Sequence, residues 1–443
     1  MARDVTAECT DLLQHLIRNQ CVNDGTIGSG REAESVELLE GYLAGAGLDV
    51  ERYEPQPGRA SLVARIEGSD PKAPSLLLMG HTDVVPVNVH DWSRDPFGGE
   101  VVDGFVWGRG AVDMLNMTAS MAVAFRRLAD SGFKPKGTIS YLAVADEEAL
   151  GTWGAKHLVE HERDAVFADY VITETGGFQM PTPDGPRLPV MVDEKGTYWS
   201  KLTVHGTPGH GSQPFRTDNA VVTAAEVVRR LAEYEPPTVV GETWRRFVEG
   251  MQYPPEFRDA LLKDDELREF AGTLPLGMSR IVYSCTHTTF APTVIHGGSK
   301  TNVIPDEVEI QVDVRTLPGE TEEDVHVHLR NALGELYDRV DLEGNDDPST
   351  ASPIDTPLWD SLQTIAGRLV EGSALIPFVM VGGTDNRFFR RAGSVGYGFS
   401  LFSRRLTFED FATMFHGNDE RVDQESLGLS AELWDAVARE FVG

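Results

Sequence analysis

The sequence predicts an α/β protein into which a second, α+β domain is inserted. Towards both ends of the chain, helical periods alternate with short apolar runs, which is typical of a mixed, mostly parallel sheet flanked by helices. The middle of the chain has the order strand, helix, strand, strand, helix, which describes a small sheet with helices on one face. We therefore assign residues 1–196 and 345–443 to a discontinuous first domain and residues 197–344 to the insert.

The first domain is expected to contain its elements in two blocks. In the first block, a helical period at 33–46 precedes four apolar runs expected to be strands, at 62–66, 76–79, 138–145 and 170–173. The second block follows an Asp- and Pro-rich stretch at 344–357. It contains a helix at 358–370, strands at 378–381 and 394–399, and a closing helix at 425–441.

The insert is expected to form its own small sheet. Its predicted elements are strands at 198–205, 293–296 and 308–315 and helices at 220–233 and 323–339. The stretch 234–280 is rich in charge, proline and aromatic residues, and we interpret it as a helical excursion within the insert.

Composition excludes several classes of partner. The formal net charge of -31 repels phosphate backbones and anionic membrane surfaces, so we expect neither nucleic acid nor membrane as a partner. The N-terminus has no apolar signal-peptide core and no later run approaches the ~18 apolar residues of a membrane helix, which predicts a cytoplasmic protein. Cys9, Cys21 and Cys285 form no C-x-x-C pair, so we interpret them as small packing residues.

A histidine and an aspartate two residues apart follow the predicted strand 76–79. Positions two apart share a face of an extended chain, so Asp83 can accept the second ring N–H of His81. That bond would fix the tautomer that presents a bare nitrogen to a metal. Taken alone, a histidine at a strand end is more often a hydrogen-bonded structural residue.

Three acidic residues follow the predicted strand 138–145. Asp146, Glu147 and Glu148 are also favoured there by the dipole of a following helix. However, the carboxyl edge of a parallel sheet is where such folds bind ligands, and crowded carboxylates need cations. Neighbouring side chains project in different directions, so Glu148 can bind a metal while Glu147 faces a water molecule as proton acceptor.

Three further positions each present one candidate ligand. Asp113 follows a glycine-rich turn, Glu174 ends the fourth predicted strand, and His416 lies in the loop before the last helix. Each taken singly is typical of a structural residue. Together with His81 and Glu148 they form a set of oxygen and imidazole donors without thiolates, which is the set that a hydrolytic zinc pair uses.

These motifs resemble family twenty of the metallopeptidases, which includes aminoacylase, acetylornithine deacetylase, succinyl-diaminopimelate desuccinylase and glutamate carboxypeptidase. The matching segments, in the family's order, are 80–86, Trp92, 95–97, 108–114, 146–148 and 416–420. The resemblance spans nearly the whole chain. It implies a zinc-exopeptidase-like catalytic domain and a ferredoxin-like inserted lid through which two copies form a homodimer.

The resemblance also implies a metal centre of two zinc ions per subunit, with Co²⁺ or Mn²⁺ as substitutes. One ion would be bound by His81, Asp113 and Glu174. The second would be bound by Asp113, Glu148 and His416, so that Asp113 bridges the two.

Further roles follow from the same resemblance. Glu147 is implied as the general base and Asp83 as the partner of His81. His210 belongs to a lid loop that, in the family, reaches the partner's active site and stabilises the oxyanion. The peptide bond after the bridging aspartate is commonly cis, which implies a cis bond between Asp113 and Met114.

The residues implied in substrate binding lie in the insert and in a late loop. Asn302 and Arg315 match lid strands that contact substrate, and Gly383 and Arg387 match a loop that binds the substrate carboxylate. Arg315 has an alternative interpretation, as a partner for the surplus of acidic residues. The long excursion at 234–280 departs from compact members of the family.

The predicted function is a dinuclear zinc hydrolase acting on a small molecule with a free carboxylate, either an N-acyl amino acid or the C-terminal residue of a small peptide. Glu147 would take the proton of the attacking water and then protonate the departing amine. Glu174, where aminopeptidases of the family tend to have aspartate, favours this substrate class.

Three alternatives remain open. One is a dipeptidase of the same family, and one, from a different class, is a non-catalytic binding or scaffold protein, against which the intact ligand set argues. A dinuclear phosphoesterase is disfavoured because no basic phosphate-binding cluster or glycine-rich anion loop lies beside the candidate ligands.

Overall fold

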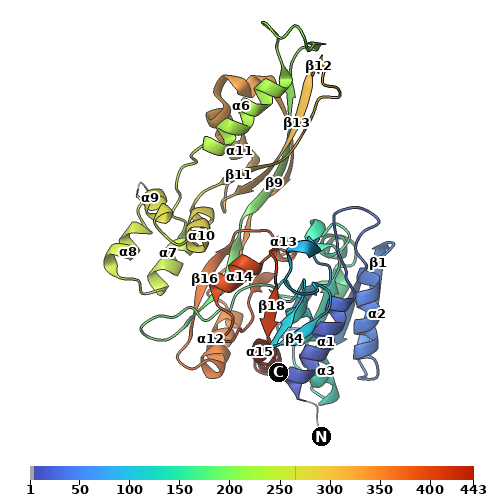
Figure 1. The fold of residues 1–443 in the computed structure, drawn as a ribbon. Helices are drawn as coiled ribbons and strands as arrows, with labels where there is room; N and C mark the ends of the chain where they lie inside the picture. Colours follow the sequence, from blue (N-terminus) through green and yellow to red (C-terminus); the bar gives the residue numbers. More distant parts are fainter. Residues whose placement is uncertain (1–3, 265) are drawn as a thin grey trace.

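The computed structural model describes residues 4–264 and 266–443, so residues 1–3 of the first predicted domain and residue 265 of the predicted excursion lie outside the described part. The part of the molecule that contains both termini is built around a nine-stranded mixed sheet, and we call this part the body (Figure 1). Its strands are β1 (Asp49–Gln56), β2 (Arg59–Ile66), β3 (Leu76–His81), β6 (Ile139–Val144), β7 (Tyr170–Thr173), β8 (Arg187–Glu194), β15 (Thr350–Ala351), β16 (Ala374–Met380) and β17 (Val395–Gly398). They lie in the order β1-β2-β6-β3-β7-β17-β8-β15, with β16 paired to β8.

The centre of this sheet is parallel and covered on both faces. β3 pairs in parallel with β6 and β7, and β17 pairs in parallel with β7. The helices of the body are α1 (Val5–Arg18), α2 (Glu32–Leu43), α3 (Leu115–Asp130), α4 (Ala155–His161), α5 (Arg163–Val166), α12 (Pro357–Leu369), α13 (Asn386–Arg391), α14 (Phe408–Met414) and α15 (Gln424–Phe441). Leu76 and Leu78 of β3 lie in the core with α1, α3 and α15, whereas Leu77 and Met79 lie in a second core with α4. This burial on both faces explains the continuous apolar run of β3.

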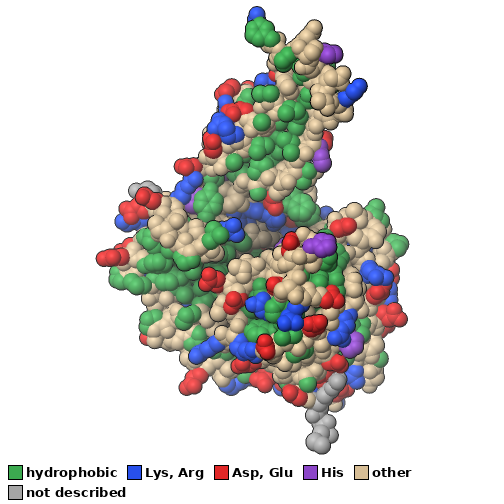
Figure 2. All heavy atoms as spheres, in the orientation of Figure 1, with side chains coloured by type: hydrophobic (Ala, Val, Ile, Leu, Met, Phe, Trp, Pro, Cys, Tyr) green, Lys and Arg blue, Asp and Glu red, His purple; other side chains and the backbone are tan. Residues whose placement is uncertain are grey.

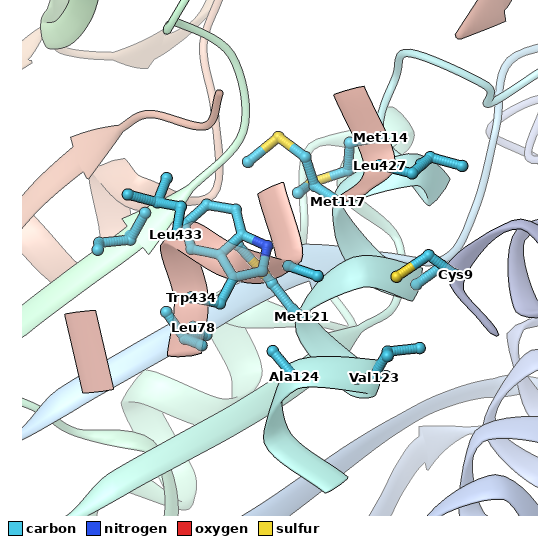
Figure 3. Close-up of a cluster of buried hydrophobic side chains, with 14 of the residues drawn as sticks. Cys9, Leu78, Met114, Met117, Met121, Val123, Ala124, Leu427, Leu433 and Trp434 are labelled. Atoms are coloured by element: carbon cyan, nitrogen blue, oxygen red, sulfur yellow. The ribbon is translucent and has the colours of Figure 1, made fainter. Parts of the chain in front are cut away.

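The larger of these cores joins α3 to α15. Figure 3 shows Trp434 of α15 near Met121 of α3 and Leu78 of β3. The indole Nε1 of Trp434 donates to Ser120 Oγ at 3.1 Å, so the ring is buried without leaving its polar atom unpaired.

A second sheet forms the elongated upper part of Figure 1, which we call the lid. Its strands β9 (Gly196–His205), β11 (Thr289–Gly297), β13 (Glu307–Thr316) and β14 (Val340–Asp347) pair antiparallel in the order β11-β13-β9-β14. The helices α6 (Ala220–Glu233) and α11 (Glu322–Leu333) pack with it around an apolar core, and α11 continues into the 3-10 helix η3 (Gly334–Arg339). At the lid tip, β10 (Gly209–His210) pairs with β12 (Val303–Ile304).

Four helices connect the lid helix α6 to strand β11. They are α7 (Glu242–Gly250), α8 (Pro255–Ala260), α9 (Leu267–Gly272) and α10 (Leu276–Thr286). The stretch predicted as an excursion is therefore helical. Its apolar residues pack against β16 and β8 of the body, and not into the core of the lid sheet. Figure 1 shows α10 close to α14 and β16.

A short three-stranded sheet completes the body. It contains β4 (Glu100–Val102), β5 (Phe105–Trp107) and β18 (Arg421–Asp423), in the order β18-β5-β4. The 3-10 helices η1 (Val89–Asp91) and η2 (Glu147–Ala149) lie in the loops after β3 and β6. Because β18 pairs with β5, the loop before the last helix lies beside the glycine-rich turn that leads to Asp113.

The structure also bears on the expectations about the cysteines and about membrane-spanning helices. Cys9, Cys21 and Cys285 are buried and free, which confirms them as packing residues. Across residues 4–264 and 266–443, no helix combines the length and apolar character that crossing a bilayer requires.

Candidate metal centre

Three parallel strands deliver candidate ligands to one edge of the large sheet. β3 ends at His81, β6 is followed by Glu147 and Glu148, and β7 is followed by Glu174. Because these strands are parallel neighbours, their carboxyl ends meet at the same edge. The structure thus brings together side chains that lie up to 93 positions apart in the printed sequence, from 81 to 174.

The first ligand group consists of His81, Asp113 and Glu174. One donor atom from each lies within 4.8 Å of the others, and all three residues are buried. The Nε2 atom of His81 lies 3.3 Å from Asp113 Oδ1. The ring's other nitrogen, Nδ1, lies 2.9 Å from the backbone oxygen of Asp83. A carbonyl oxygen can only accept, so Nδ1 carries a proton, and Nε2 is the ring nitrogen that a cation beside Asp113 would bind.

The second ligand group consists of Asp113, Glu148 and His416, again within 4.8 Å of one another. His416 Nε2 lies 3.0 Å from Asp113 Oδ2 and 3.2 Å from Glu148 Oε2. The two oxygens of Asp113 therefore face different groups, Oδ1 towards His81 and Oδ2 towards His416. This is the arrangement that a carboxylate bridging two cations requires.

The side chains of the site are crowded and, except for the exposed His416, largely buried, which perturbs their protonation. Burial raises the pKa of Glu174 well above its usual range, and the nearby charge of Asp113 adds to the effect. Burial likewise raises the pKa of Glu147, to which Glu174 contributes. Burial lowers the pKa of His416, but its bonds to Asp113 and Glu148 outweigh this and raise it to about 10. So many carboxylates at close range are stable as anions only with cations among them.

Asp83 holds the loop that carries the two glutamates. Its Oδ1 accepts from the backbone N–H of Glu147 at 3.3 Å, and its Oδ2 accepts from that of Glu148 at 3.1 Å. The side chain of Asn23 donates to Oδ2 at 2.8 Å. The predicted contact with His81 is made mainly by the backbone oxygen of Asp83, because Oδ1 lies 3.7 Å from Nδ1. The carboxylate is instead occupied by these backbone donors.

The sequence did not reveal the ion pair that positions Asp113. Arg109 and Glu420 form a buried ion pair at 2.7 Å. Glu420 Oε1 also accepts from the backbone N–H of Val112 at 2.7 Å and from that of Asp113 at 3.1 Å. Both residues lie inside the matched motifs, but only the fold places them in contact. The peptide bond between Asp113 and Met114 is cis, which confirms the expectation from the resemblance.

A cavity of about 330 Å³ opens beside the two ligand groups. Glu147 lines it together with members of both groups, and from the proposed substrate residues Arg315, Arg387 and Gly383 also line it. Figure 2 shows Lys and Arg side chains in the hollow between lid and body. The structure therefore brings three of the four proposed substrate residues to the metal-ligand edge.

His210 and Asn302 lie elsewhere. Both belong to the lid tip, where the backbone N–H of Gly211 donates to Asn302 O at 2.8 Å and His210 pairs with Val303. In Figure 1 this tip lies at the end of the lid away from α14 and the ligand groups. Within one chain, the structure does not bring these two residues to the cavity.

The donor set fits divalent cations. The two groups contain imidazole and carboxylate donors and no thiolate, as zinc sites in hydrolases do. In addition, Glu148 Oε1 is buried without a hydrogen-bond partner among the described residues. A buried carboxylate oxygen that accepts no hydrogen bond is suited to bind a cation. These residues are therefore suited to hold two metal ions.

This combination of fold and site defines a metal-dependent hydrolase of amide or peptide bonds. The sheet presents its ligands at the carboxyl edge, and the shared aspartate joins two groups beside a substrate-sized cavity. The model of peptidase family M20/M25/M40 matches residues 77–440, and the chain belongs to this family.

The relatives include acylases and peptidases. N-fatty-acyl-amino acid synthase/hydrolase PM20D1 of Xenopus tropicalis is 29% identical over 385 residues, which cover 85% of this chain and 74% of the relative. Aminoacylase-1 of Homo sapiens is 27% identical over 396 residues, covering 88% and 85%. Among solved structures, the M20 family metallo-carboxypeptidase Sso-CP2 of Sulfolobus solfataricus aligns with a TM-score of 0.74 at 16% identity over 98% of this chain and 99% of that one. The mixed central sheet with flanking helices is thus the fold of M20 metallopeptidases.

Proposed function

We propose that this protein is a dinuclear zinc hydrolase that cleaves the amide bond of an N-acyl amino acid or releases the C-terminal residue of a small peptide. The observation that carries the proposal is the pairing of two ligand groups, joined by Asp113, with two arginines in one cavity. The names of the relatives, an N-fatty-acyl-amino acid hydrolase, an aminoacylase and a carboxypeptidase, agree with this substrate class.

The metal ions would be held by the two groups described above. When bound, they would polarise the scissile carbonyl and lower the pKa of the attacking water. His81 and Glu174 would hold one ion and Glu148 and His416 the other, with Asp113 shared.

Glu147 would move the protons. It lines the cavity next to the ligand Glu148, and its backbone is fixed by Asp83. Its carboxylate would accept a proton from the attacking water. The same group would then donate that proton to the departing amine.

Arg315 and Arg387 would bind the carboxylate of the substrate. Arg387 donates to Asp347 Oδ2 at 2.7 Å and to Leu150 O at 2.9 Å, so its guanidinium is held rigidly. Arg315 is held by Asp313 and Thr197. The terminal nitrogens of a guanidinium carry two N–H groups each, so both arginines keep donors for a ligand. The glycine at 383 leaves this side of the cavity open.

The insert, residues 197–344, which contains the lid, would act as the dimerisation domain inserted into the catalytic domain. Its tip and edge expose large apolar side chains, among them Phe215, Val222 and Ile295, which are 87%, 65% and 56% exposed. Such a patch is typical of a surface that meets another protein. A homodimer through this surface would allow His210 and Asn302 to reach the partner's cavity and assist there.

The proposal is tested with matched substrates. N-acyl amino acids and the same compounds with the carboxyl group converted to an amide are incubated with protein supplied with Zn²⁺, Co²⁺ or Mn²⁺. We expect the free acids to be hydrolysed and the amides to lose about a hundredfold or more in kcat/KM, because the arginines lose their partner. Equal rates for both would exclude carboxylate recognition. If dipeptides with a free amine are hydrolysed, and neither the N-acyl amino acids nor their amides are, the protein is a dipeptidase.

A further inference from the structure

The two arginines of the cavity are each paired with an aspartate of the lid. Arg387 Nε donates to Asp347 Oδ2 at 2.7 Å. Arg315 donates to Asp313 through Nε at 2.7 Å and through Nη2 at 3.1 Å, which makes a two-point ion pair. Both arginines line the cavity, whereas neither aspartate is among the described residues that line it. The positive charges that face the cavity are therefore balanced by negative charges that lie outside it.

The register of the lid sheet creates this arrangement. Thr197 in β9 lies opposite Arg315 in β13 on one side and opposite Asp347 in β14 on the other. Residues directly opposite in neighbouring strands project from the same face of a sheet. Asp313 lies two positions before Arg315 in β13 and therefore shares that face. The lid thus presents one arginine and two aspartates together, and Arg387 of the body bonds to one of these aspartates.

The pair of Arg387 and Asp347 crosses the junction between body and lid. The side chain of Arg387 is 5% exposed and that of Asp347 is 18% exposed, so water screens their charges only weakly. The other oxygen of Asp347 contacts Arg391, which is exposed. Asp385 also acts on Arg387, but its oxygens accept no hydrogen bond from the described residues, the guanidinium included. A carboxylate that binds Arg387 would therefore meet a charge that Asp347 already balances.

The position of the Arg387 guanidinium does not depend on Asp347 alone. Its Nη1 donates to the backbone oxygen of Thr384 at 2.5 Å, and its Nη2 donates to that of Leu150 at 2.9 Å. An asparagine at position 347 would keep an amide oxygen that can accept from Nε, and it would remove only the negative charge. The effect of the charge can therefore be measured separately from the placement of the arginine.

We propose that Asp347 and Asp313 limit the affinity of the cavity for the substrate carboxylate, because they neutralise Arg387 and Arg315 from the lid. This inference rests on the proposed function for the presence of that carboxylate. A carboxylate at Arg387 would lie across the guanidinium from Asp347, and like charges repel at such short range. The released amino acid keeps the same carboxylate, so fully charged arginines would hold product as tightly as substrate. Such uniform binding does not speed turnover, and the two aspartates reduce it.

Non-hydrolysable ligands measure this effect without turnover. One ligand is the ketomethylene isostere of N-acetyl-leucine, in which a methylene replaces the amide N–H, and the other is its carboxyl amide. Calorimetry gives their affinities for the zinc-loaded wild type and Asp347→Asn. We expect Asp347→Asn to bind the acid about threefold to tenfold more tightly and the amide equally well. The matched control Asp346→Asn removes an exposed charge from the other face of β14 and should leave both affinities unchanged.

Each outcome decides the proposal. An unchanged or lower affinity of Asp347→Asn for the acid would overturn it, as would an equal gain in Asp346→Asn. If Asp347→Asn does not fold, Asp313→Asn tests the same balance at Arg315 and should show the same gain. If the acid binds wild type more tightly than the amide but gains nothing in the variants, carboxylate recognition stands and this inference fails. If acid and amide bind equally to wild type and to both variants, carboxylate recognition itself fails.

Discussion

The carboxyl edge of the large sheet and the tip of the lid would each be stabilised by a binding partner, but the two partners differ in kind. At the sheet edge, Asp113, Glu148 and Glu174 are buried close together, and burial raises the pKa of the two glutamates. At the lid tip, Phe215 and Val222 are apolar and exposed to water. Crowded buried carboxylates are stabilised by cations, whereas exposed apolar side chains are stabilised by contact with protein.

The difference shows where each part of the chemistry comes from. The sheet edge contains both candidate ligand groups and Glu147, the proposed proton carrier, within one chain. The lid tip holds His210, which lies far from that edge in Figure 1. Under the proposed function, one chain therefore supplies the metal centre and the other the lid histidine. The predictions below separate these two contributions.

The largest effect is expected at the sheet edge, from Glu147→Gln. The amide cannot accept the proton of the attacking water, so kcat should fall by about 10²–10⁴. The metal content, measured by mass spectrometry of the purified protein, should not change, because Glu147 belongs to neither ligand group. Glu160→Gln, at an exposed position of α4, is the control and should keep wild-type kcat. A Glu147→Gln enzyme with undiminished turnover would remove this residue from the mechanism.

A smaller effect is expected at the lid tip, from His210→Ala. Loss of an oxyanion donor should lower kcat by about 10²–10³. Mixing equal amounts of the His210→Ala and Glu147→Gln chains, after dissociation and reassociation, gives hybrid dimers with one intact site. If His210 acts across a symmetric dimer, the mixture should regain about a quarter of wild-type activity. A mixture as inactive as its parents would show that the tip does not serve the partner's site.

The smallest effect is expected where the body joins the lid, at Lys195 between β8 and β9. Its Nζ donates to the backbone oxygens of Ser284 at 3.0 Å and His287 at 2.7 Å, at the end of α10. Burial lowers the pKa of Lys195 to about 7, whereas a lysine in the unfolded chain titrates near 10.4. Between these values the unfolded chain binds more protons than the folded one, so the free energy of unfolding rises with pH.

Lys195→Met removes this pH dependence. From pH ~7 to ~10, wild type should gain stability relative to the variant by up to about 1.4 kcal/mol per pH unit. Urea unfolding at several pH values measures the difference, and Lys156→Met, at an exposed position of α4, provides the control. A constant difference between wild type and Lys195→Met over this range would show that Lys195 stays charged in the folded protein.

The sequence predicted those elements whose periodicity is clear. β7 and α6 have the predicted bounds, and the predicted helix 323–339 is divided between α11 and the 3-10 helix η3. No element was predicted for α3 or β14. α3 is buried on almost all sides and so has no polar face to mark its period, and β14 is an exposed edge strand with few apolar residues. Neither has the hydrophobic pattern on which such predictions depend.

The candidate site divides in a similar way. The types of its ligands and their positions after strands were visible in the sequence, because strand ends of a parallel sheet share an edge. The buried pair of Arg109 and Glu420 was not, since the two residues are far apart in the chain and meet only when β18 pairs with β5. Contacts of this kind depend on sheet topology, which residue spacing does not encode.

The sequence by itself determined the candidate chemistry of this protein, namely a set of carboxylate and imidazole side chains suited to bind metal and an acidic neighbour suited to transfer a proton. It also determined the hydrophobic patterns of the two sheets. These follow from local residue types and local periodicity. Only the tertiary structure decided which oxygen of Asp113 faces which histidine, that α7–α10 pack on β16, and that His210 lies at the far end of the lid. Those features arise from packing between distant segments, because their free energy depends on contacts that no single stretch of sequence contains.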